Sequence, residues 1–180
     1  MALHETMWLE RARTIFLYVL AVVAVSIGVL LAAEPAHADT TFFVNSAKDR
    51  VDVRPGNGTC YTGVGIVHDD GGIERECTLR AAIQEANAFP GADAINFGIP
   101  STEDSNCVAT TNVCTISPAS QLPTITRPLN IRGYSQPEAS ANTATIGTNA
   151  ELKIVLNGSR IESSADGLLV TARNTSVRGS

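Results

Sequence analysis

Hydrophobic positions in residues 39–180 fall into short runs separated by turn residues, and one stretch, Leu79–Ala88, has helical spacing. Its apolar residues at positions i, i+3, i+4 and i+7 are Leu79, Ala82, Ile83 and Ala86. Thr78 is suited to be the N-cap, because its hydroxyl can accept a hydrogen bond from a first-turn N–H. Pro90 and Gly91 end the pattern. The spacing predicts one amphipathic helix, too short to be stable alone, that must lie on an apolar surface.

The other short runs are β-branched or alternate between apolar and polar residues, which is typical of strands. They are residues 40–44, 94–97, 115–117, 124–126, 129–131, 153–156 and 168–170. Prolines and turn residues between them disfavour helices. We therefore expect an all-β fold with one capping helix, namely the N-terminal portion of a parallel β-helix, a solenoid of short strands and frequent corners. A β-sandwich of longer strands joined by hairpins is the alternative.

The helix has a role in this expected solenoid. The end of a solenoid exposes apolar side chains and unpaired backbone groups, which favour aggregation, and we expect the helix to cover that end. The residues of this structural cap are Thr78, Leu79, Arg80, Ala82, Ile83 and Ala86. Arg80 is expected to pair with an acid such as Glu76 or Asp93 and so to fix the helix against a loop.

The beginning of the chain has the pattern of a secretory signal peptide. Arg11 and Arg13 precede an unbroken apolar stretch, residues 15–31, and the small residues at 36–38 form an A-x-A cleavage site. We expect residues 1–38 to be removed on export, after which the protein has no membrane association. The alternative is a retained membrane anchor, since the stretch is long enough to span a bilayer.

Composition narrows the function classes. Only 17% of the residues are charged and 44% are hydrophobic, which excludes a charged coiled coil and wholesale disorder. The formal net charge is −5, and Lys48 and Lys153 are the only lysines. This balance excludes the basic footprint of a nucleic-acid-binding protein.

Four cysteines follow the predicted signal peptide: Cys60, Cys77, Cys107 and Cys114. An even number in an exported chain predicts two disulfides, with three possible pairings. We favour Cys60–Cys77 and Cys107–Cys114, because each pair brackets one loop that is rich in Gly, Asn or Thr. A zinc site made of four thiolates is the alternative, but the chain lacks the close C-x-x-C pairs typical of such sites.

The segment CTLRAAIQEANA at residues 77–88 resembles the signature of the CSLREA N-terminal domain family of exported bacterial proteins. The strand-like run at 41–46, the acidic loop at 52–60 and the helix exit at 90–97 are similar to the flanking parts of that family, as are segments within 122–137. Two positions depart from the family pattern, because Thr78 replaces Ser and Ala81 replaces Glu. The loss of Glu removes half of a capping box. The resemblance implies an exported, often surface-located protein in which the motif opens a right-handed β-helix.

These patterns predict three parts. Residues 1–38 form the signal peptide, residues 39–92 the N-terminal cap of strand, acidic loop and helix, and residues 93–180 the first coils of the solenoid. Residues 168–177 have no terminal cap, so we expect the coils to be truncated at the end of this chain.

Candidate chemistry is sparse. The acidic loop before the helix offers oxygen ligands for calcium, with Asp49, Asp52, Asp69 and Asp70 as the candidates, although it lacks the D-x-D-x-D-G pattern. His68 stands beside Asp69 and has no identifiable nucleophile to activate. No residue is assigned a catalytic role, and no cofactor other than calcium is considered.

The expected function is therefore adhesion to, or contact with, carbohydrate or extracellular matrix, without catalysis, by a secreted or cell-surface protein. The alternative is a carbohydrate-active enzyme, a lyase or hydrolase of acidic polysaccharide, whose active face lies in later coils. Asp93, Lys153, Arg160 and Asp166 are the residues of this chain that could line such a face. A fold shared with enzymes is only an analogy.

Overall fold

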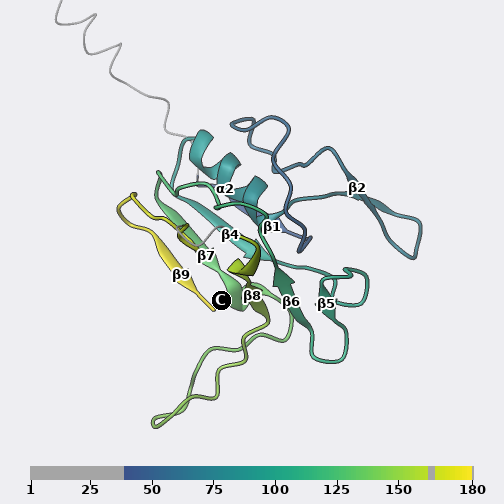
Figure 1. Ribbon diagram of the computed structural model, residues 1–180, viewed down its shortest axis with the longest axis vertical. Coiled ribbons are helices and arrows are strands. Elements are labelled where there is room, and N and C mark those ends of the chain that lie inside the picture. Colours follow the sequence, from purple (N-terminus) through teal and green to yellow (C-terminus); the bar gives the residue numbers. More distant parts are fainter. Residues whose placement is uncertain (1–38, 162–164, 180) are drawn as a thin grey trace, which may run out of the picture. The chain divides into compact units, whose positions relative to one another are not determined.

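The computed structural model describes residues 39–161 and 165–179 (Figure 1). These residues belong to one unit, His37–Ser180. The predicted signal peptide, residues 1–38, lies outside the described residues. Within the described part of the chain, no helix has both the length and the apolar character needed to cross a membrane.

The largest sheet has four parallel strands in the order β1-β4-β7-β9 (Figure 1). Its strands are β1 (Thr41–Val44), β4 (Asp93–Phe97), β7 (Leu129–Arg132) and β9 (Ser176–Arg178). The register aligns Phe42, Ile95, Ile131 and Val177 in one row across the sheet. The first three of these side chains are buried in the core. Because side chains alternate along a strand, the neighbouring residues form the opposite, outer face.

Helix α2 (Leu79–Ala88) begins and ends where the apolar spacing predicts. Thr78 is its N-cap, and the Thr78 hydroxyl accepts a hydrogen bond from the Ala81 N–H at 3.2 Å. The helix follows β1 in the chain and precedes β4, and it contacts both strands. Ile83 is fully buried in the core that the helix shares with the sheet.

Two smaller sheets complete the fold. Strands β2 (Gly65–Val67) and β3 (Ile73–Arg75) form an antiparallel hairpin. Strands β5 (Cys107–Val108), β6 (Val113–Ile116) and β8 (Ile154–Leu156) form the other sheet, in which β6 and β8 are parallel. Two 3-10 turns, η1 (Gly133–Ser135) and η2 (Gly158–Arg160), follow β7 and β8.

The expected all-β solenoid is wrong, and so is the sandwich alternative. The fold is mixed α/β, with a four-stranded parallel sheet and small separate sheets, and no described sheet is closed or curled. The reason lies in the helix: parallel neighbours such as β1 and β4 need a crossover connection, and α2 is part of that connection. It is therefore an integral element of an α/β arrangement and not a lid on the end of an all-β structure.

Both disulfides join residues that lie close along the chain. Cys60 is bonded to Cys77, which directly precedes the N-cap of α2, and Cys107 is bonded to Cys114 across the β5–β6 pair. No cysteine is left free, so the four-thiolate zinc site is excluded. Disulfides persist in oxidising compartments. The protein therefore belongs to an oxidising, extracellular environment.

We expect Ile83→Ala to lower the free energy of unfolding by about 2–5 kcal/mol, because the substitution leaves a cavity in the shared core of α2, β1 and β4. Urea unfolding with both disulfides intact measures this loss. Val67→Ala is the matched control, since Val67 is 69% exposed and its truncation should change stability by no more than about 0.5 kcal/mol. Equal effects of the two substitutions would contradict the packing described here.

We expect the buried carboxyl group of Asp93 to make the stability of the protein depend on pH. Burial raises the pKa of its carboxyl above the ordinary 3.8, against the lowering effect of the hydrogen bond from the Thr40 N–H. A raised pKa means that the folded state favours the protonated acid, so stability is lost as pH rises through the raised pKa. Asp93→Asn keeps an acceptor for the Thr40 N–H, so it should raise the Tm at neutral pH and flatten this pH dependence. A lower Tm at neutral pH, with Asp69→Asn as the exposed control, would refute the assignment.

Candidate functional site

The polar side chains of α2 attach loops to the helix. The Arg80 Nε donates to Asp49 Oδ1 at 2.6 Å, and its Nη2 donates to Asp49 Oδ2 at 3.1 Å. The same guanidinium donates to the backbone carbonyls of Ser120 and Gln121. Arg80 therefore pairs with an acid and fixes the helix against the loop, as expected, but the acid is Asp49 and not Glu76 or Asp93.

Glu76 is buried and forms a second polar centre just before the helix. Its carboxylate accepts hydrogen bonds from Arg50 at 2.7 and 2.9 Å, from Ser46 at 3.0 Å and from Thr62 at 2.6 Å. A buried carboxylate needs such donors to offset its desolvation. The interaction fixes the segment after β1, which also holds Lys48 and Asp49.

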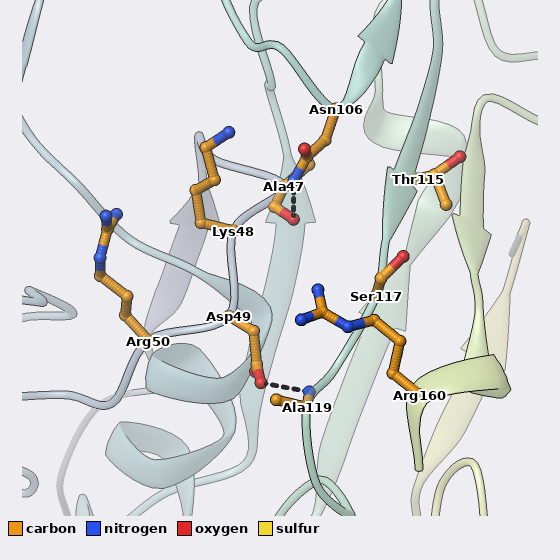
Figure 2. A pocket seen from close by; sticks show the side chains of 9 residues that line it. All are labelled: Ala47, Lys48, Asp49, Arg50, Asn106, Thr115, Ser117, Ala119 and Arg160. Atoms are coloured by element: carbon orange, nitrogen blue, oxygen red, sulfur yellow. Dashed lines mark hydrogen bonds between the residues drawn. The ribbon is translucent and has the colours of Figure 1, made fainter.

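A pocket of about 490 Å³ opens beside this segment (Figure 2). We call it the Arg160 pocket. The lining residues that matter here are Lys48, Asp49, Arg50, Thr115, Ser117 and Arg160. Cys114 and Ile116 are buried, so the alternation along β6 leaves Thr115 and Ser117 on the pocket side. Arg160 is the last residue of η2, and Figure 2 shows its guanidinium reaching over Ser117 toward the segment that holds Asp49.

Most charged groups of the pocket are engaged by the protein itself. Lys48 Nζ lies 2.6 Å from Ser105 Oγ and 3.7 Å from Asp104, and Arg50 is held by Glu76. Arg160 differs, because it is exposed and has no hydrogen-bond or ion-pair partner among the residues that the structure describes. It is the cation of this pocket that can bind a ligand without first breaking an internal ion pair.

The acid–base chemistry of the pocket is limited. Asp49 is its one carboxylate, and both oxygens are occupied, Oδ1 by Arg80 and Oδ2 by Arg80 and the Ala119 N–H. Glycoside hydrolysis generally uses two carboxylic groups on either side of the bond that is cleaved. The pocket therefore has groups suited to binding an anion or a hydroxylated ligand, and it lacks that catalytic pair.

The four calcium candidates do not come together. Asp49 is bound to Arg80, and Asp52 accepts hydrogen bonds from the N–H groups of Arg54 and Tyr61. Asp69 and Asp70 are exposed in the β2–β3 turn. Among the described residues, no three His, Cys, Asp or Glu side chains are arranged to hold a metal ion. Each of these carboxylates accepts hydrogen bonds within the protein or faces solvent.

The structure also separates the four residues proposed for an enzymatic face. Asp93 is fully buried at the start of β4, and Lys153 is bound by Glu151 and the Thr111 carbonyl. Asp166 is exposed, and of the four only Arg160 lines the pocket. The sequence reasoning missed Lys48, Arg50, Thr115 and Ser117. The alternating charges at residues 48–50 are a signal for Lys48 and Arg50, and no pattern in the sequence indicates Thr115 or Ser117 as site residues.

His68 lies between two carboxylates and has no nucleophile beside it. Its Nδ1 is 2.8 Å from Glu103 Oε2, and its Nε2 is 3.3 Å from Glu74 Oε2. The hydrogen bond with Glu103, reinforced by Glu74, raises the pKa of His68 above 6.5. Since Glu74 lies on β3, the imidazole links the β2–β3 hairpin to the loop that holds Glu103.

Comparison of the chain with protein-family models, curated proteins and solved structures finds no match.

The His68 contacts predict a pH-dependent stability of the hairpin. Because the pKa is raised in the folded state, protonated His68 contributes stability below pH 6.5, and this contribution is lost as pH rises through the raised pKa. An NMR titration of the imidazole should show that Glu103→Gln lowers the His68 pKa more than Glu74→Gln, since Glu103 is the closer partner. The reverse order, or a wild-type pKa below 6.5, would contradict the contacts.

Proposed function

We propose that this chain is a secreted or cell-surface protein that contacts carbohydrate or extracellular matrix without catalysis, and that the Arg160 pocket binds a sugar bearing a carboxylate. The observation that carries the proposal is the Arg160 guanidinium, which has no partner among the described residues and lies in a pocket lined with the hydroxyl groups of Thr115 and Ser117. Guanidinium groups match carboxylates in shape and charge and can bind them through two parallel hydrogen bonds.

The remaining lining suits a sugar. The hydroxyls of Thr115 and Ser117 have no side-chain hydrogen bond to other described residues, so they are available to donate to and accept from sugar hydroxyls. The volume of about 490 Å³ falls within the ordinary size range of small-molecule sites. It is large enough for one monosaccharide unit.

The hydrogen bonds that the Asp49 carboxylate accepts within the protein support binding of a sugar without its cleavage. A carboxylate whose two oxygens are engaged by Arg80 and the Ala119 N–H is poorly placed to act on a substrate. The wall of the pocket also depends on this interaction, since it joins the loop at Ala119 to the segment after β1.

Export supports the same proposal from the sequence. The predicted signal peptide at 1–38 and the two disulfides agree in indicating an extracellular protein. The resemblance of residues 77–88 to the CSLREA N-terminal domain family remains a proposal in its own right, and it favours the same compartment.

Titration with D-galacturonate, followed by NMR, tests the pocket. We expect Arg160→Gln to weaken binding about tenfold, the loss of about one charge-assisted hydrogen bond. The uncharged methyl ester of the sugar should bind the wild type no better than galacturonate binds the variant. Arg54→Gln is the matched control, because Arg54 is exposed, lies outside the pocket and carries the same charge.

Two outcomes would overturn the proposal. Equal weakening by Arg54→Gln would show that general charge attraction, and not the pocket, binds the sugar. Release of reducing or unsaturated ends from polygalacturonate by the wild type, lost in Asp49→Asn, would show that the protein is an enzyme.

A further inference from the structure

We propose that the outer face of the main sheet is a second binding surface, for a linear acidic glycan. The surface is a row of four residues, here called the outer row: Phe43, Asn96, Arg132 and Arg178. The strand register places them side by side, since Phe43 is opposite Asn96, Asn96 opposite Arg132, and Arg132 opposite Arg178. These residues share no member with the Arg160 pocket, so this inference goes beyond the function proposed above.

The outer row is open to solvent at both ends. Phe43 is 60% exposed, and both arginines are exposed. Neither Arg132 nor Arg178 has a side-chain hydrogen bond or an ion pair with another residue of 39–161 or 165–179. Fold stability gives no reason for an aromatic ring and two free guanidinium groups to share one row.

The charge arrangement is unfavourable in the absence of a ligand. Adjacent strands are about 4.8 Å apart, and Arg132 and Arg178 stand at paired positions of β7 and β9. Like charges at opposite positions disfavour a sheet. The parallel row on the same face offers no compensation, because its residues are Thr41, Ala94, Asn130 and Ser176. Within it, Ser176 Oγ donates to Asn130 Oδ1 at 2.8 Å. An anion bound between Arg132 and Arg178 would offset the repulsion.

The length and chemistry of the outer row point to a chain and not to a single small anion. Three strand spacings span roughly 14 Å, which suits several consecutive units of a linear polymer. Arg132 and Arg178 provide donors for carboxylate or sulfate groups. Asn96 lies between them and Phe43, with its Oδ1 buried, so it contributes to the row as a half-buried amide. The exposed ring of Phe43 offers an apolar surface for the C–H face of a sugar.

The extracellular environment favours a glycan over a nucleic acid. The net charge of −5 also opposes a general attraction for polyanions. Binding should therefore depend on the outer row itself, which makes the inference testable with single side chains.

The test uses the full chain with both disulfides formed and measures binding to immobilised polygalacturonate, which carries carboxylates, and to heparin, which carries sulfates. The expected result is binding to at least one of them, weakened about tenfold by Arg132→Gln or by Arg178→Gln and further by the double variant. Phe43→Ala should weaken binding while Phe43→Leu weakens it less. Fully methyl-esterified polygalacturonate, which lacks the charge, should not bind.

The matched control is Arg173→Gln. Arg173 is exposed, has no described partner and lies outside the outer row, so its loss should leave glycan binding unchanged. The inference is overturned if Arg173→Gln weakens binding as much as Arg132→Gln, if neither glycan binds, or if an oligothymidylate binds as tightly as the glycans.

Arg160→Gln separates the two proposals. It should reduce binding of D-galacturonate to the pocket and leave polymer binding to the outer row intact. All these positions are exposed, so their substitution should not disturb the fold, and a Tm of each variant that is not below that of the wild type verifies this.

Discussion

The structure depends on hydrogen bonds to the polar side chains that are buried with helix α2. Glu85 is the clearest case, because it lies on the helix and is fully buried. Its carboxylate accepts hydrogen bonds from the backbone N–H groups of Gly56, at 2.6 Å, and Gly58. Both glycines have positive φ, a conformation that other residues rarely adopt. A buried charge without donors would cost several kcal/mol, so the loop can have only the path that brings these N–H groups to Glu85.

The same constraint positions the walls of the Arg160 pocket. Arg80 lies on the polar side of α2, and its guanidinium connects Asp49 with the carbonyls of Ser120 and Gln121. Asp49 then accepts a hydrogen bond from the Ala119 N–H. Two segments that are far apart in sequence, the one after β1 and the one after β6, are thus held by one side chain of the helix. The pocket lies between these segments because the hydrogen bonds of Arg80 hold both of them against the helix.

The sequence predicted the local elements better than their assembly. The bounds of α2 follow from apolar spacing, and β1, β4, β7 and β8 lie within or next to predicted runs. Strands β3, β5 and β9 were missed, since each has only two or three residues and forms by pairing its backbone with a neighbour. Residues 124–126 and 168–170 were expected to be strands, but they form only an isolated bridge between Ile125 and Val170.

The predicted fold class was wrong because a single short helix was interpreted as a lid on an all-β array, whereas it belongs to a parallel crossover. Of the site, Arg160 was among the candidates for the wrong reason, since the face proposed for it does not form.

The placement of the arginines distinguishes those that form ion pairs within the fold from those whose guanidinium groups have no described partner. The chain has 18 acidic and 13 basic residues, so acids are in excess and every arginine could in principle find a partner. Arg50 and Arg80 do so, against carboxylates that are buried or nearly so and that need them. A missing partner does not by itself indicate a binding site, because Arg54 and Arg173 on loops also have none within residues 39–161 and 165–179. What distinguishes Arg160 is the hydroxyl-lined hollow beside it, and what distinguishes Arg132 and Arg178 is their adjacency across two paired strands. The two proposed binding surfaces are therefore defined by these neighbours and not by a missing partner alone.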